Sequence, residues 1–328
     1  MKNKISAILL AICMLGSVMM LAACKNTDAK NEQISIVTTI FPEYDGVRNV
    51  LGGQNDRAEV TLLLDSGADL HSYQPTVADI AKISFCDLFI YVGGESDEWV
   101  DDALKNATNK DMEVINLLEV LGDKAKEEEI VEGMEEEHDH EEEGEEEEET
   151  EYDEHVWLSL KNSQIFVREI SNALGRIDQK NAEAYSEAAT SYCAELSALD
   201  EKYGQTVASA GKKTVLFGDR FPFRYLVDDY GISYYAAFVG CSAETEASFE
   251  TVVFLSEKTD ELGLNAILKI ESSDGKIAQT IKENTAAKNQ KILTMDSLQS
   301  ATSKEYDEGR TYLHVMEENL AVLKEALG

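Results

Sequence analysis

Short apolar stretches of strand length alternate along the chain with segments in which apolar residues recur at helical spacing. The alternation occurs twice, once in each half of the chain. The predicted strands are 34–39, 58–64, 87–92 and 113–117 in the first half, and 214–217, 234–238, 265–270 and 291–295 in the second. The predicted helices among them are 45–51, 76–85, 246–262, 273–283 and 305–327. Strands that alternate with helices in this way predict an α/β fold with two lobes, each built on a parallel sheet.

A long helical pattern lies between the two halves. Residues 163–207 keep apolar side chains at helical spacing with no proline among them. An unbroken helix here would span on the order of 65 Å at ~1.5 Å per residue, although Gly175 could divide it into two. We therefore predict an N-terminal lobe at 34–160, a long rigid connecting helix at 161–208 and a C-terminal lobe at 209–328.

The first 23 residues have the pattern of a targeting segment. A basic start is followed by an almost wholly apolar stretch that ends in Leu21-Ala22-Ala23-Cys24, and polar residues come next. Small residues directly before a cysteine are typical of a bacterial lipoprotein signal peptide, which is cleaved before the cysteine. A retained transmembrane signal anchor is the alternative, but it would not need this ending. We expect signal peptide 1–23, a lipid on the thiol of Cys24 and a tether at 24–33, which together place the protein on the outer face of a bacterial cell membrane.

Negative charge is concentrated in one segment. The 328 residues include 29 Lys+Arg against 64 Asp+Glu, a net charge of −35, and 19 of the 28 residues in 127–154 are acidic. This charge argues against a nucleic-acid partner, because phosphate binding needs clustered Lys and Arg. A run of like charge is solvated and can simply aid solubility, but His138 and His140 lie inside this one. Because imidazoles and carboxylates are ligands for divalent cations, we interpret 127–154 as a metal-collecting loop.

Four further residues with metal-binding side chains lie where a cleft between the lobes would form. His71, Asp219 and Asp296 each follow a predicted strand, and His155 follows the acidic segment. Functional residues of parallel sheets gather at the carboxyl ends of the strands, so these four could converge. Histidine with carboxylate suits Zn²⁺, Mn²⁺ or Fe²⁺.

The cysteines of the mature chain do not indicate a thiolate site. Once Cys13 is removed and Cys24 is lipidated, three remain, and none forms a close Cys-x-x-Cys pair. An odd number without close pairs argues against a disulfide framework and a thiolate zinc site. We interpret Cys86, Cys193 and Cys241 as small buried apolar residues.

Motifs along nearly the whole mature chain resemble those of the solute-binding lipoproteins of zinc and manganese ABC importers. The matching segments are FPEY at 41–44, GADLHSYQP at 67–75, AKIS at 81–84, DLFIY at 87–91, EHVWL at 154–158, residues 225–231, IESS at 270–273 and MDSL at 295–298. The resemblance implies two α/β lobes joined by one long helix, with the metal in the cleft between them. It implies His71 and His155 as first-lobe ligands and Asp296 as a second-lobe ligand. Zinc-binding members of the family often carry a His- and acid-rich loop where 127–154 lies.

One position departs from the family pattern. The family's third ligand, His in zinc proteins and Glu in manganese proteins, comes three residues before an aromatic residue that aligns with Phe223. Arg220 occupies that position here, and a guanidinium cannot bind a metal. We predict that the neighbouring Asp219 serves instead. Glu271 and Glu244 are weaker candidates, and Arg220 is a cleft residue that could pair with one of these carboxylates.

These features predict capture of a metal ion and not catalysis. The resemblance implies an extracytoplasmic component of an ABC importer that delivers Zn²⁺ to a membrane permease with its ATPase. Two His with two carboxylates would by themselves favour Mn²⁺ or Fe²⁺, whereas the His-containing acidic loop favours Zn²⁺, our first choice. A surface zinc hydrolase is a weaker alternative, because the sequence has no His-Glu-x-x-His motif. A metal-stabilised adhesin is the remaining one.

Overall fold

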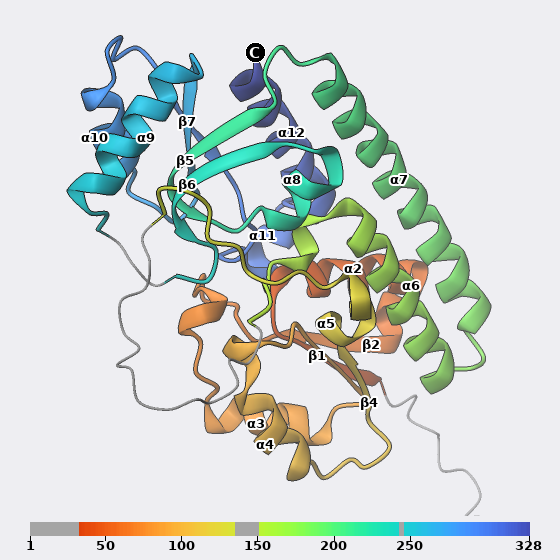
Figure 1. The fold of residues 1–328 in the computed structure, drawn as a ribbon. Helices are drawn as coiled ribbons and strands as arrows, with labels where there is room; N and C mark the ends of the chain where they lie inside the picture. Colours follow the sequence, from red (N-terminus) through yellow and green to blue (C-terminus); the bar gives the residue numbers. More distant parts are fainter. Residues whose placement is uncertain (1–32, 135–150, 243–245) are drawn as a thin grey trace, which may run out of the picture. The chain divides into compact units, whose positions relative to one another are not determined.

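The computed structural model describes residues 33–134, 151–242 and 246–328, and Figure 1 shows their arrangement. Every element described below lies in the compact unit Ile34–Gly328. Within the described residues, none of the helices combines the length and the apolar character that crossing a membrane would require. The predicted signal peptide, Cys24, His138, His140 and Glu244 lie outside the described residues.

The first lobe is built on a four-stranded sheet in the order β2-β1-β3-β4, in which every neighbouring pair is parallel. Its strands are β1 (Ile34–Thr38), β2 (Ala58–Leu62), β3 (Leu88–Tyr91) and β4 (Glu113–Asn116). All four residues of β3 are buried. Leu88 and Ile90 pack into the main core, while Phe89 and Tyr91 belong to a smaller core on the other face. A continuous apolar strand is expected of a parallel sheet that is covered on both faces.

The second lobe repeats this design. Its sheet has the order β6-β5-β7-β8, again with parallel pairs. Its strands are β5 (Thr214–Phe221), β6 (Ser233–Val239), β7 (Ala266–Ile270) and β8 (Lys291–Met295). β5 runs past its predicted end, and its register against β6 shifts between Phe217 and Arg220. Asp219 and Arg220 therefore lie within the strand and not in a loop after it.

Helices fill the connections between strands. They are α2 (Phe41–Leu51), α3 (Val77–Phe85), α4 (Trp99–Lys105), α5 (Leu117–Leu121), α8 (Arg224–Tyr230), α9 (Phe249–Glu261), α10 (Lys276–Asn284), α11 (Ser303–Asp307) and α12 (Tyr312–Leu327). The sequence pattern missed α4, α5 and α8, which are short. It also merged the last two helices, which Gly309, with φ of 101°, and the N-cap Thr311 separate.

Two helices connect the lobes over the predicted connection 161–208, so the division that Gly175 was expected to allow is present. They are α6 (Leu160–Ile177) and α7 (Ala182–Ser209), which pack side by side along their length (Figure 1). The break comes three residues after Gly175, at Asp178. The carboxylate of Asp178 accepts hydrogen bonds from Arg57, Asn181 and Tyr185, so the polar turn is fixed by side chains. The two lobes and their helical connection are otherwise as predicted.

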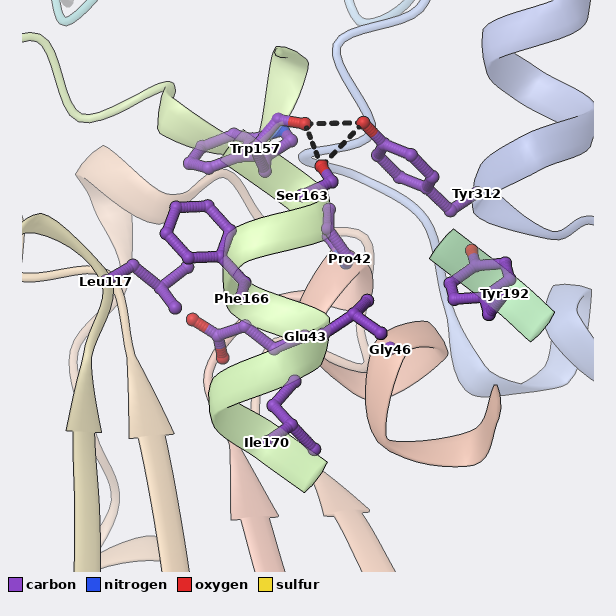
Figure 2. A pocket seen from close by; sticks show the side chains of 11 residues that line it. Pro42, Glu43, Gly46, Leu117, Trp157, Ser163, Phe166, Ile170, Tyr192 and Tyr312 are labelled. Atoms are coloured by element: carbon purple, nitrogen blue, oxygen red, sulfur yellow. Dashed lines mark hydrogen bonds between the residues drawn. The ribbon is translucent and has the colours of Figure 1, made fainter. Parts of the chain in front are cut away.

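The two lobes share one apolar core. The main cluster of buried side chains includes residues of both sheets and of α6, α7 and α12. Trp157, almost fully buried, donates its indole N–H to the carbonyl oxygen of Ser297 over 2.9 Å. Beside it, Tyr312 Oη donates to the carbonyl oxygen of Trp157 and accepts from Ser163 Oγ (Figure 2). The cavity in Figure 2 has about 20 Å³ of free space, enough for about one water molecule, so it is packing space and not a ligand site.

Candidate metal centre

His71 is positioned by a short 3₁₀ helix after β2. This helix, Leu70–Ser72, begins at Asp69, whose carboxylate accepts a hydrogen bond from the backbone N–H of His71 over 3.1 Å. The Nδ1 atom of His71 lies 2.9 Å from Ser96 Oγ and 3.4 Å from Glu154 Oε2. A carboxylate on this side favours the proton on Nδ1, which leaves the lone pair on Nε2 free.

His155 is held in the same manner from the other side. Its side chain is fully buried, and its Nδ1 lies 3.1 Å from Asp153 Oδ1, which also accepts from the backbone N–H of His155. The carboxylate again favours the proton on Nδ1. Trp157 packs beside the imidazole, with ring centroids 5.3 Å apart. The Nε2 atom of His155 therefore presents a lone pair in a fixed direction.

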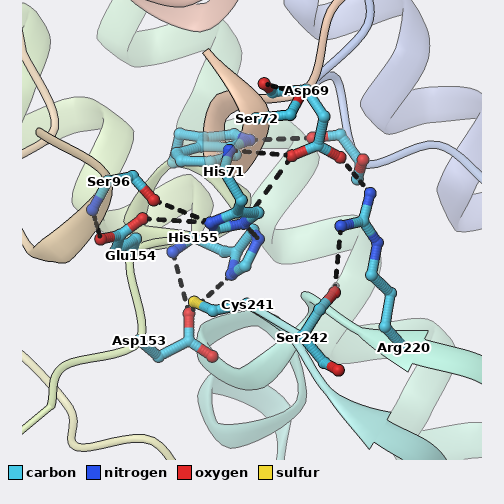
Figure 3. Close-up of polar contacts among 12 residues, drawn as sticks. Asp69, His71, Ser72, Ser96, Asp153, Glu154, His155, Arg220, Cys241 and Ser242 are labelled. Atoms are coloured by element: carbon cyan, nitrogen blue, oxygen red, sulfur yellow. Dashed lines mark hydrogen bonds and ion pairs between the residues drawn. The ribbon is translucent and has the colours of Figure 1, made fainter. Parts of the chain in front are cut away.

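The two Nε2 atoms face each other at 3.2 Å (Figure 3). With both protons on Nδ1, two lone pairs meet there, an arrangement that is unfavourable unless a cation lies between them. Two nitrogens that bind one tetrahedral Zn²⁺ at ~2.0–2.1 Å are roughly 3.3 Å apart, close to the separation observed. A hydrogen bond between the rings would instead require one of the two Nε2 atoms to carry a proton.

Cys241 is the third member of this group. Its Sγ lies within 4.8 Å of one ring nitrogen of His71 and one of His155, and these two nitrogens are equally close to each other. Among the described residues, these three side chains form a group that could hold a metal ion. This corrects the interpretation of Cys241 as a small buried apolar residue. Cys86 and Cys193 do pack in apolar clusters, whereas Cys241 is partly exposed and belongs to none of the described apolar clusters. Cys241 follows the end of β6, at the same edge of the sheet as the residues that follow the other strands, and this position is the sequence signal that points to it.

Buried acids surround the group and make it attractive to a cation. Asp97, Asp153 and Glu154 are each at most 3% exposed. Burial raises the pKa of Asp97 to about 7, and the charge of Glu154 adds to this. Burial by itself raises the pKa of Glu154, but its interactions with His71 and Ser96 outweigh that effect and hold the pKa below its ordinary value. Glu154 is therefore ionised beside His71.

Arg220 joins the two lobes next to this group. Its guanidinium pairs with Asp69 of the first lobe, the residue that caps the helix carrying His71. It also donates to the carbonyl oxygen of Ser242 over 3.4 Å. The predicted pairing of Arg220 with a carboxylate is therefore found, but among the described residues the partner is Asp69 and not Asp219 or Glu271.

The predicted carboxylate ligands are engaged elsewhere. Asp219 accepts hydrogen bonds from the backbone N–H groups of Arg220 and Ile270. Asp296 pairs with Arg310. Glu271 accepts from the backbone and side chain of Ser297, and burial followed by the charge of Asp296 raises its pKa. None of the three belongs to the group of His71, His155 and Cys241, so their role as ligands stays a prediction.

Gly240 allows the second lobe to approach the site closely. A Cβ atom there would lie 2.9 Å from Cε1 of His155 and 2.9 Å from the carbonyl oxygen of Phe221. Replacing Gly240 with alanine should push the His155 ring and lower zinc affinity about tenfold, as for loss of an outer-shell contact. Isothermal titration calorimetry measures the zinc affinity of the variant and of the wild type. Gly204→Ala, where no atom lies within 4 Å of the added methyl group, is the control; equal affinity of both variants and the wild type would show that the contact does not matter.

The structure has two lobes, each built on a parallel sheet, and both lobes contribute side chains to a group of potential metal ligands. These are the features of a two-lobed metal-binding protein. The profile of the ZnuA family, described as zinc-uptake complex component A, periplasmic, matches residues 36–326. The chain therefore belongs to the ZnuA family. The resemblance inferred from the sequence motifs is confirmed.

Individual relatives agree with this assignment. The chain is 32% identical over 315 residues to the high-affinity zinc uptake system protein ZnuA of Bacillus subtilis, covering 94% of each chain. It is 30% identical over 323 residues to the zinc-binding lipoprotein AdcA of Streptococcus pneumoniae, covering 98% of this chain but only 61% of AdcA. The crystal structure of the Zn(II)-bound ZnuA-like domain of that AdcA superposes with a TM-score of 0.70 at 27% identity, covering 90% of this chain and 99% of the domain. The two-lobed fold is thus that of ZnuA-like structures.

Proposed function

We propose that this protein is the extracytoplasmic solute-binding component of an ABC importer, which captures Zn²⁺ between its lobes and delivers it to a membrane permease driven by an ATPase. The observation that carries the proposal is the pair of facing Nε2 atoms of His71 and His155, 3.2 Å apart, each imidazole anchored through Nδ1 by a carboxylate. The relatives named for zinc uptake and zinc binding support the choice of ion. Lipidation of Cys24 would hold the protein at the membrane.

Zinc is the cargo in this proposal, and the protein is not an enzyme. A zinc hydrolase needs an open coordination position and a general base near the metal. Glu154, the nearest candidate base, lies against Nδ1 of His71 and accepts from the backbone N–H of Ser96. It therefore faces the side of the imidazole opposite to the metal-binding nitrogen. Its role is to orient His71, as carboxylates behind metal-binding histidines commonly do.

Calorimetric titration of the metal-free full-length chain with Zn²⁺, and separately with Mn²⁺, tests this function. We expect one tight site per chain for Zn²⁺ and weaker binding of Mn²⁺. A matched variant lacking 135–150 keeps the flanking contacts of Glu128 with Glu151 and of Lys126 with Asp153. If the acidic segment only collects ions, this variant should bind one Zn²⁺ with the same affinity as the full-length chain. Absence of tight zinc binding in the full chain, or its loss with 135–150, would contradict the proposal.

A further inference from the structure

We propose that Cys241 binds the zinc ion as a thiolate, so that the site is completed by a sulfur ligand from the second lobe. This inference rests on the proposed function, because it concerns the same ion. As the Zn–S bond forms, the thiol proton leaves for water and the sulfur carries the negative charge. A thiolate is the form of cysteine that serves as a metal ligand.

The sulfur of Cys241 lies close to the nitrogens of both histidines. Sγ of Cys241 and the nitrogens of both imidazoles lie within 4.8 Å of one another. For Zn–N of ~2.0–2.1 Å and Zn–S of ~2.3 Å, a tetrahedral site separates sulfur from nitrogen by roughly 3.6 Å. Only a small movement of Cys241 towards the two imidazoles would therefore bring all three donors onto one ion.

The segment 240–242 is held against the site by three sets of contacts. The backbone N–H of Cys241 donates to Glu128 Oε1 over 3.2 Å, and Arg220 donates to the carbonyl oxygen of the next residue, Ser242. Gly240 lets the backbone lie against the ring of His155. A cysteine that only filled space would not need such anchoring.

The surroundings of the Cys241 thiol are polar, unlike those of the other two described cysteines. Glu128 accepts a hydrogen bond from the backbone N–H of Cys241, and both imidazoles lie beside its sulfur. The other two cysteines of the described part are packed in apolar cores. Cys241 alone among the three is surrounded by carboxylates and imidazoles, where a cation would be attracted.

Arg220 leaves the second lobe without the expected third ligand. The position from which the family pattern predicts a third ligand carries a guanidinium, which cannot bind the ion and pairs with Asp69 instead. Without a further donor, the group would present only two nitrogens. The next strand, β6, ends close to β5 and supplies Cys241. Two imidazoles with a thiolate form a softer set than histidines with carboxylates, and soft donors favour Zn²⁺ over Mn²⁺ and Fe²⁺.

Cobalt replaces zinc as a spectroscopic probe in the test. Co²⁺ is added to the metal-free full-length chain, to Cys241→Ser and to the control Cys193→Ser, and absorption is recorded in the visible and near ultraviolet. We expect the wild type and Cys193→Ser to show a sulfur-to-cobalt charge-transfer band that saturates at one equivalent and disappears on addition of Zn²⁺. We expect Cys241→Ser to bind Co²⁺ without this band. Cys241→Ala should behave like Cys241→Ser.

The outcomes separate this inference from the proposed function. One-to-one cobalt binding with d–d bands but no charge-transfer band in the wild type would overturn the thiolate ligand and leave zinc capture standing. Failure of the wild type to bind either Co²⁺ or Zn²⁺ would overturn both. As a second measurement, competition titration should show the ratio of Zn²⁺ to Mn²⁺ affinity falling at least about tenfold in Cys241→Ser, since a soft donor has been lost. An unchanged ratio would count against the proposal.

Discussion

Replacing His155 with alanine is expected to lower zinc affinity by about a hundredfold or more. The substitution removes one of the two facing nitrogens and leaves Asp153 buried without the imidazole that it contacts. Outer-shell partners of a metal ligand are typically worth ~10–100-fold in affinity, so loss of the ligand itself should cost at least as much. A fluorescent zinc chelator in competition with the protein measures the affinity.

Two kinds of variant serve as controls for His155→Ala. His314→Ala removes an exposed histidine of α12 that contacts Glu318 and should leave affinity unchanged. Asp296→Asn and Asp219→Asn test the ligands expected from the sequence, and the geometry predicts small effects for both. If either carboxylate variant loses as much affinity as His155→Ala, the zinc ion is bound by a different set of side chains from the one described here.

Replacing Trp157 with alanine is expected to destabilise the fold by ~3–5 kcal/mol, the usual cost of truncating a large buried aromatic residue. Trp157 is only 1% exposed, and its indole N–H donates to Ser297 of the second lobe. The residue therefore fills the shared core and ties the lobes together. Urea unfolding followed by circular dichroism gives the change in the free energy of unfolding.

The conservative variant Trp157→Phe separates packing from hydrogen bonding. It keeps most of the apolar volume and removes the N–H donor, so we expect a smaller loss, about 1–3 kcal/mol, because the carbonyl oxygen of Ser297 is left without this partner. Equal losses for the two variants would show that the hydrogen bond dominates. A loss below about 1 kcal/mol for Trp157→Ala would contradict the role of this residue in the shared core.

Much of the fold could be predicted because the apolar pattern of a parallel α/β lobe is set locally. β8 matches its predicted bounds, and β1 and β7 differ from theirs by one residue. The connecting segment could not be resolved in the same way, since apolar spacing continues across the turn at Asp178. Only the side chains around Asp178, among them Arg57 from the first lobe, show why the helix ends there.

The structure brings together the two histidines expected from the sequence, and their role as metal ligands stays a prediction. His71 and His155 are recognisable because their motifs are local in sequence. Cys241 could not be linked to them by spacing, because it reaches the histidines only through the packing of β6 against β5 and through the close approach at Gly240. The pairing of Arg220 with Asp69 likewise joins residues from different lobes, which no local pattern reveals.

The central claim is that one zinc ion is bound between His71 and His155. A crystal structure of the zinc-loaded full-length chain, with an anomalous difference map recorded at the zinc absorption edge, tests it most directly. We expect one strong anomalous peak that lies ~2.0–2.1 Å from the Nε2 atoms of both histidines, which is the bonding distance for zinc and nitrogen. A principal peak on Asp219, Glu271 or Asp296 without these two nitrogens, or one bound only by the acidic segment, would contradict it.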